Sequence, residues 1–312
     1  MRTAFIDTLL ELAQADERIV LIVGDLGFGV VNSFVDRLPR QIINAGVAEQ
    51  NMTGLAAGIA LSGKIVFTYS IANFATLRCL EQIRNDICYH GANVKVVAVG
   101  GGLAYGPLGF SHHATEDLAV LRALPNLTVV APGDPVEARH ATRAIAAHEG
   151  PCYLRLGRAD EAVVHDGGID FRLGRAITVR DGGDVALVTT GGMLAETVAA
   201  AEELARRGVR ARVISMHTIK PLDQEVLIRA ARDTGAVVTI EEHSLIGGLG
   251  GAVAEGLLEG FDGPVKFRRV ALADRFASCA GSQTFLRSQH GVDREGIIRA
   301  VGAVLEQTPQ FL

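Results

Sequence analysis

The sequence predicts an α/β protein made of two doubly wound, mostly parallel-sheet domains. Short apolar runs alternate with longer segments of helical period, and glycine-bearing turns separate them. The run Ile19-Val20-Leu21-Ile22-Val23 is apolar at every position, as expected of a parallel strand that is buried on both faces. The alternation lapses once, between residues 158 and 182, and then resumes. One α/β series therefore lies on each side of that lapse.

The elements follow from this alternation. In the first half we expect helices at 4–13, 48–61, 73–90, 116–123 and 134–148, and strands at 19–23, 41–44, 64–69, 94–99 and 127–130. In the second half we expect strands at 184–190, 210–215, 236–241 and 265–271, and helices at 193–207, 222–232, 249–258 and 295–306. Domains are predicted at 1–165 and 183–312, with a linker at 166–182 where Asp, Gly and Arg predominate.

Composition narrows the classes of partner. The 312 residues carry a formal net charge of -5 and no Lys/Arg run, so neither nucleic acid nor a membrane surface is an expected partner. No run of about 18 uncharged apolar residues occurs, so no membrane-spanning helix is expected. Acidic residues near the start interrupt any apolar stretch of the kind found in a signal peptide, which favours the cytoplasm. The four cysteines form no C-x-x-C pair, so we expect buried free thiols and no metal site on this chain. Small-molecule substrates are the expected ligands.

Glu49 stands at a position suited to chemistry. It lies where a short strand passes through Gly46 into a helix, and that helix carries an apolar stripe formed by Ala48, Met52, Leu55, Ala56 and Ile59. Burial of the stripe would hold the first helical turn rigidly. From spacing alone, a first-turn acid that complements the helix dipole is the commoner role.

The glycine clusters carry little information about ligands. Residues 24–29, Gly-Asp-Leu-Gly-Phe-Gly, follow a strand but match neither a dinucleotide-binding nor a P-loop pattern. The clusters Gly100-Gly101-Gly102 and 247–251 fall at strand ends, where open α/β sheets bind ligands, yet such glycines mostly permit tight turns. We predict no nucleotide site from them.

Several motifs, in order and spacing, resemble a known family. The segments 44–52, 70–76 (Ser-Ile-Ala-Asn-Phe-Ala-Thr), 109–117 (Gly-Phe-Ser-His-His-Ala-Thr-Glu-Asp) and 124–127 are similar to the pyrimidine-binding domain of transketolase. The segments 219–223 (Ile-Lys-Pro-Leu-Asp) and 241–250 (Glu-Glu-His-Ser-Leu-Ile-Gly-Gly-Leu-Gly) look like the carboxy-terminal domain of the same thiamine-diphosphate superfamily. The resemblance spans essentially the whole chain.

The resemblance implies a cofactor site. Glu49 matches the glutamate that hydrogen-bonds the aminopyrimidine ring of thiamine diphosphate and stabilises its imino tautomer. Phe74 matches the aromatic residue that stacks on the pyrimidine, and Ile71 a neighbouring pocket position, although core packing would also explain both. Asp25 matches an acid near the cofactor and the subunit interface, and turn capping is its alternative role.

The resemblance also implies substrate residues. His112 matches the histidine that faces the reacting carbon and substrate hydroxyls, and Arg158 and Arg2 match two arginines that hold a terminal phosphate. A solvated surface arginine is the alternative for Arg2. The chain departs from the family at Leu108 in place of an acid, at Gly29 in place of a serine, and in the 100–102 turn, which lacks a histidine. These departures put the ordinary pentose-phosphate substrates in doubt.

The family's diphosphate-binding part is missing. Residues 24–26, Gly-Asp-Leu, do not supply the Gly-Asp-Gly motif that anchors the diphosphate through magnesium in the family. The resemblance therefore implies one subunit of a split transketolase, with the magnesium ligands on an amino-terminal partner subunit and an α2β2 heterotetramer as the expected assembly. Its activity would be transfer of a two-carbon ketol unit from an anionic ketose to an aldose. The alternatives are the β subunit of a two-chain 2-oxoacid dehydrogenase component and a non-catalytic assembly partner.

Overall fold

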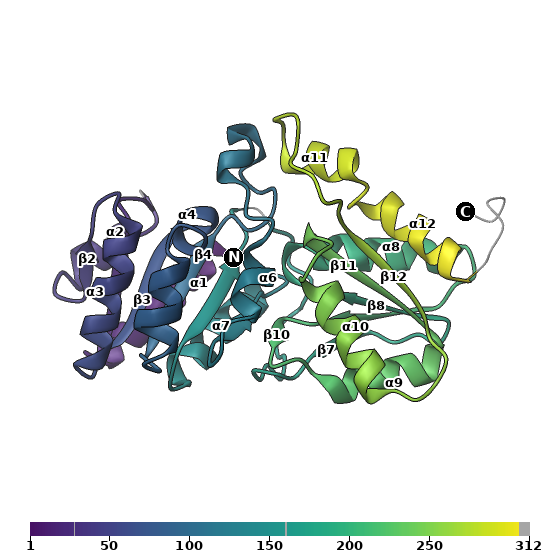
Figure 1. Ribbon diagram of the computed structural model, residues 1–312, viewed down its shortest axis with the longest axis horizontal. Helices are drawn as coiled ribbons and strands as arrows, with labels where there is room; N and C mark the ends of the chain where they lie inside the picture. Colours follow the sequence, from purple (N-terminus) through teal and green to yellow (C-terminus); the bar gives the residue numbers. More distant parts are fainter. Residues whose placement is uncertain (28, 160, 306–312) are drawn as a thin grey trace.

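Two sheets lie side by side in the computed structural model, which describes residues 1–27, 29–159 and 161–305 (Figure 1). The first sheet has seven strands in the order β10-β5-β6-β4-β3-β1-β2, and only β10 runs antiparallel to its neighbour. The second has five strands in the order β12-β11-β8-β9-β7, with β7 antiparallel to β9. The predicted fold class is confirmed.

The elements of the first half begin and end close to their expected limits. The strands are β1 (Ile19–Val23), β2 (Ile42–Asn44), β3 (Ile65–Ile71), β4 (Val94–Val99), β5 (Thr128–Val130) and β6 (Cys152–Leu156). The helices are α1 (Arg2–Ala15), α2 (Asn32–Arg37), α3 (Glu49–Leu61), α4 (Ala72–Thr76), α5 (Leu80–Gln82), α6 (Asp117–Arg122) and α7 (Pro135–Ala147). β1, β4 and β6 are buried along their whole length, as parallel strands between helical layers should be.

The second half alternates in the same way. Its strands are β7 (Ile177–Arg180), β8 (Val185–Thr189), β9 (Ala211–Ser215), β10 (Thr218–Lys220), β11 (Ala236–Ser244) and β12 (Lys266–Leu272). Its helices are α8 (Leu194–Arg206), α9 (Gln224–Thr234), α10 (Leu249–Gly260), α11 (Gln283–His290) and α12 (Arg294–Leu305). Residue 306, the last of the expected final helix, lies outside the described residues.

The structure corrects the expected elements in two ways. The single helix expected at 73–90 is divided into α4, a turn at 77–79, α5 and a π-helix at Ile83–Cys88. The buried thiol of Cys79 donates to the carbonyl of Phe74 at 3.3 Å within that turn. The strands β6, β7 and β10 and the helices α2 and α11 were not expected, and β7 falls within the segment predicted as a linker.

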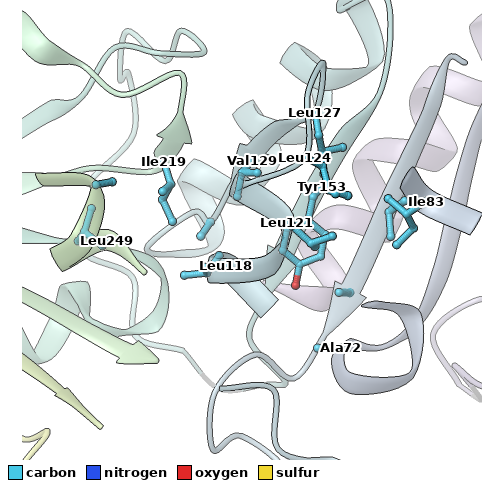
Figure 2. Close-up of a cluster of buried hydrophobic side chains, with 14 of the residues drawn as sticks. Ala72, Ile83, Leu118, Leu121, Leu124, Leu127, Val129, Tyr153, Ile219 and Leu249 are labelled. Atoms are coloured by element: carbon cyan, nitrogen blue, oxygen red, sulfur yellow. The ribbon is translucent and has the colours of Figure 1, made fainter. Parts of the chain in front are cut away.

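One of the apolar clusters spans both halves of the chain. α1 and α7 pack on one face of the first sheet. The cluster on the opposite face joins Leu118 and Leu121 of α6 to Ile219 of β10 and Leu249 of α10; in Figure 2 it extends from Tyr153 and Leu121 to Ile219 and Leu249 at the left. β10 of the second half also pairs with β5 and extends the first sheet, so part of the apolar core is shared between the two halves.

A buried polar network lies between the halves. The Arg155 guanidinium on β6 donates to the Asp117 carboxylate at 2.8 and 3.2 Å and to the carbonyl of Glu242 at 3.1 Å. The Tyr153 hydroxyl donates to the same carboxylate at 2.6 Å. Removing one partner would leave an uncompensated buried charge, which costs roughly 3–5 kcal/mol. The network therefore fixes the relative position of the two sheets.

Candidate active site

Glu49 is held at the carboxyl edge of the first sheet, where α3 begins. The chain reaches it from β2 through Gly46, whose φ of +72° suits glycine. The side chain is 1% exposed and packs against Gly24 at the end of β1, where an added Cβ would lie 3.5 Å from Glu49 Cγ. Ser70 of β3 donates its hydroxyl to Oε1 at 3.2 Å. Oε2 accepts from Arg78 Nη1 at 2.6 Å.

Arg78 connects this carboxylate to Phe74. It lies in the turn that follows α4, and its guanidinium carbon stands 4.5 Å from the centroid of the Phe74 ring. The same ring makes an edge contact with the imidazole of His112, with 5.1 Å between centroids. Glu49, Phe74 and His112, expected to share one site, are thus brought together, and Arg78 lies between the first two.

Two helices and a loop position His112. Asn73 of α4 donates its side-chain amide to the carbonyl of Ser111 at 2.6 Å and so ties the loop to the pocket wall. The Ser111 hydroxyl lies 3.1 Å from His112 Nδ1, which leaves the other ring nitrogen available to a ligand. The loop also packs against α11, because an added Cβ at Gly106 would lie 2.7 Å from Leu286 Cδ1 of that helix (Figure 1).

Two positively charged side chains, Arg158 and Arg2, lie near Tyr105, and the Tyr105 ring lies beside His112. The Tyr105 ring stands 6.5 Å from the His112 ring, and Arg158 lies over its face at 5.4 Å. Burial raises the pKa of the Tyr105 hydroxyl, while the nearby positive charges of Arg2 and Arg158 act in the opposite direction. Arg2 Nε is buried without a hydrogen-bond partner in the structure. Two arginines that converge in this way suit an anionic group.

Within the part of the chain that the structure describes, the other predicted site residues take no part in the hydrogen bonds and ring contacts of Glu49, Phe74 and His112. Asp25 is exposed in a left-handed conformation, and its carboxylate accepts from the Asn44 side chain at 2.9 Å, which supports the turn after β1. Ile71 ends β3 and is half-buried directly before α4. Leu108 is 55% exposed beside the His112 loop. The roles of Asp25 and Ile71 stay predictions.

The residues present fit the pyrimidine half of thiamine diphosphate. The Arg78 guanidinium is itself a planar group with N–H donors, and it stacks on Phe74 while donating to Glu49. An aminopyrimidine is also planar and requires an aromatic face and an acceptor at these places.

Among the described residues, no group of three or more His, Cys, Asp or Glu side chains could hold a metal ion. No helix within the same residues is long and apolar enough to cross a membrane.

Sequence reasoning missed Ser70, Arg78 and Tyr105. Arg78 follows Phe74 by four residues, a spacing that brings side chains together on a helix, so its position could have been noticed. The Tyr105 ring can occupy its position only because residue 100 is a glycine: an added Cβ at Gly100 would lie 2.1 Å from the ring. The prediction of buried free thiols is wrong for Cys279, which is exposed; the other three cysteines are buried.

Comparison with known proteins defines the class. The family model described as "Transketolase, pyrimidine binding domain" matches residues 1–161, and "Transketolase, C-terminal domain" matches residues 174–297. The chain therefore belongs to the transketolase family, and these two domains span most of its length.

Its relatives include subunits of divided transketolases. The chain is 42% identical to the 6-deoxy-6-sulfo-D-fructose transketolase subunit SqwH of Clostridium sp. (strain MSTE9), over 98% of this chain and 95% of that protein. It is 39% identical to one subunit of the apulose-4-phosphate transketolase of Phocaeicola vulgatus, over 96% and 95%. A solved structure titled "Split gene transketolase, inactive beta4 tetramer" aligns with a TM-score of 0.89 and 41% identity, over 98% of this chain and 97% of that one. The prediction of a split-transketolase subunit is confirmed.

Proposed function

We propose that this chain supplies the pyrimidine pocket and the substrate-binding corner of a two-chain transketolase, which transfers a two-carbon ketol unit between sugars. The observation that carries the proposal is the arrangement around Glu49: a buried carboxylate, an aromatic face and a loop histidine meet at one edge of the sheet. When bound, thiamine diphosphate supplies the carbon nucleophile for the donor carbonyl. Magnesium ligands are expected on the partner chain.

Each residue of the pocket has a distinct task in this proposal. Glu49 holds a proton between its Oε2 atom and the pyrimidine ring nitrogen, and Ser70 fixes the direction of the carboxylate through Oε1. Phe74 provides the stacking face. His112 donates to or accepts from a substrate hydroxyl through the ring nitrogen that Ser111 does not engage. Burial of the Glu49 side chain, which is 1% exposed, limits the access of competing water.

The substrate is proposed to be an anionic sugar. Arg158 and Arg2 carry positive charge near Tyr105, whose ring lies beside His112, and a terminal anionic group of the substrate would bind there. Two relatives are named for a sulfonated sugar and a phosphorylated sugar, so a terminal anion is a shared feature of those names. Leu108 leaves this part of the pocket with an apolar side chain, which favours a donor that offers fewer hydroxyl groups.

The test is reconstitution. We expect this chain, mixed with a partner chain that carries Gly-Asp-Gly and supplied with thiamine diphosphate and magnesium, to transfer a ketol unit from a ketose phosphate or sulfonate to an aldose. Products would be followed by mass spectrometry. A reconstituted complex that binds the cofactor but only decarboxylates 2-oxoacids would instead support the dehydrogenase alternative.

A further inference from the structure

Arg78 occupies the place that the proposed function assigns to the aminopyrimidine ring. Its Nη1 atom donates to Glu49 Oε2, and its guanidinium carbon lies 4.5 Å from the Phe74 centroid. Glu49 Oε1 is already directed inward by Ser70 and packed against Gly24, so Oε2 is the acceptor left for a ligand. A ring that stacks on Phe74 and bonds to Oε2 therefore cannot enter while Arg78 stays.

The Arg78 side chain is far more exposed than the carboxylate that it contacts, so it is the group that can move away. It is 43% exposed, while Glu49 is 1% exposed. Its backbone lies in the turn at 77–79, and that turn is anchored by the buried Cys79, so only the side chain has to move. A long arginine side chain reaches solvent by rotation about its own bonds, with no change in the fold.

We infer that Arg78 is an internal competitor for the cofactor: it closes the pyrimidine pocket in the unliganded chain and must swing out before thiamine diphosphate binds. This inference rests on the proposed function and adds a closed state to it. The apparent dissociation constant of the cofactor then equals the intrinsic constant divided by the fraction of chains with Arg78 out. If that fraction is about one tenth, removing the guanidinium tightens binding about tenfold.

The sign of the effect separates this role from an anion-binding role. Thiamine diphosphate is an anion, so removing a nearby positive charge would weaken its binding if Arg78 were a ligand or contributed to attraction. A competitor gives the opposite result. Arg78→Ala removes both the charge and the stacking group, whereas Arg78→Lys keeps the charge but loses the planar fork that stacks and donates to the carboxylate.

The experiment measures cofactor binding to the complex of this chain with its partner by calorimetry at a fixed magnesium concentration. We expect about tenfold tighter binding for Arg78→Ala, an intermediate gain for Arg78→Lys, and no gain for Arg84→Ala, an exposed arginine of the π-helix. Melting temperatures of each variant report whether the fold is intact. In parallel, the free aminopyrimidine alone, 4-amino-5-hydroxymethyl-2-methylpyrimidine, is titrated into this chain, and Arg78→Ala should again bind it more tightly.

Two results overturn the inference in different ways. Equal or weaker cofactor binding by folded Arg78→Ala, with a wild-type complex that binds normally, shows that Arg78 does not compete, and the proposed function stands. A wild-type complex and variants that all fail to bind thiamine diphosphate overturn the proposed function and this inference together.

Discussion

Neighbouring residues fix the direction in which the buried Glu49 carboxylate points. Ser70 and Gly24 fix its inner oxygen, and the start of α3 fixes its backbone, so only Oε2 faces a ligand. The sequence could predict the position of Glu49, because the glycine-to-helix transition is local. It could not predict Ser70 or Arg78 as its partners, because those contacts depend on how β3 and the turn after α4 lie beside α3.

Glu49→Gln should keep the fold and lower turnover by at least about a hundredfold, the loss typical of removing general acid–base help. Glutamine has the same size but cannot exchange a proton with a ring nitrogen. Turnover of the reconstituted complex is measured at saturating cofactor, so that weaker binding does not contribute. Glu81→Gln, which changes an exposed acid of α5, is the matched control. Near-normal turnover for Glu49→Gln would return Glu49 to a helix-dipole role.

Arg158→Ala should raise KM for an anionic ketose about 10- to 100-fold, because a lost hydrogen bond to a charged group costs roughly 1.5–3 kcal/mol. KM for a neutral analogue should change little. Steady-state kinetics with the two sugars give the comparison, and Arg232→Ala, at an exposed position of α9, serves as a control for the loss of one positive charge. Parallel increases for both sugars would remove Arg158 from the anion site.

At the scale of elements, long segments with a clear hydrophobic period follow their predicted limits closely, whereas the sequence pattern leaves β6, β7, β10, α2 and α11 unmarked. Long apolar or amphipathic segments such as β1, α3 and α7 were placed within one or two residues. β10 pairs with β5 of the other half, and a pattern along the chain does not reveal such a contact. The helix expected at 73–90 keeps an unbroken apolar period, and only tertiary contacts around Cys79 reveal its division.

His217, which directly precedes β10, should make stability depend on pH. Burial lowers the pKa of its imidazole to about 4, while the negative charge of Glu137 acts in the opposite direction. The ring stacks on Phe171 with 3.9 Å between centroids. Since the unfolded state binds a proton more readily, this group contributes stability that is present above pH 6.5 and lost as the pH falls toward 4. Between about pH 7.5 and 4.5 the loss is on the order of 2–3 kcal/mol.

Urea unfolding at the two pH values measures this loss. His217→Phe keeps the stacking ring but cannot titrate, so its stability should fall less on acidification than that of the wild type. His140→Phe is the control, because His140 also stacks on Phe171 but is only half-buried. Identical pH dependence of the wild type and His217→Phe would show that another group causes the acid loss.

At the scale of the whole molecule, the two halves behave as one unit. β10 completes the first sheet, the apolar core is continuous across the joint, and Arg155 joins Asp117 to the backbone of β11. The sequence predicted two domains and a linker, but patterns along a chain do not reveal contacts between its halves. The domain limits at 165 and 183 stay predictions. Experiments on function therefore require the full chain.

The pocket around Glu49 accounts for only the pyrimidine half of a cofactor site, and this predicts that the chain alone binds thiamine diphosphate poorly and is inactive. Residues 24–26, Gly-Asp-Leu, do not supply the Gly-Asp-Gly motif that anchors the diphosphate through magnesium in the family, so we expect the magnesium ligands on the partner chain. We propose that the partner chain completes the site across a large, obligate-type interface and that two copies of each chain form a closed α2β2 assembly. The solved structure with 41% identity is titled an inactive β4 tetramer, which describes a related chain assembled with copies of itself.

Calorimetry compares cofactor binding by this chain alone with cofactor binding by this chain and its partner together. Thiamine diphosphate with magnesium is titrated first into this chain alone and then into an equimolar mixture with the Gly-Asp-Gly partner, and ketol transfer is assayed on the same samples. We expect weak binding and no transfer in the first case, and tight, magnesium-dependent binding with transfer in the second. Sedimentation of the mixture should give the mass of two chains of each kind. Tight magnesium-dependent binding by this chain alone would contradict the prediction, since it would require a diphosphate site within these 312 residues.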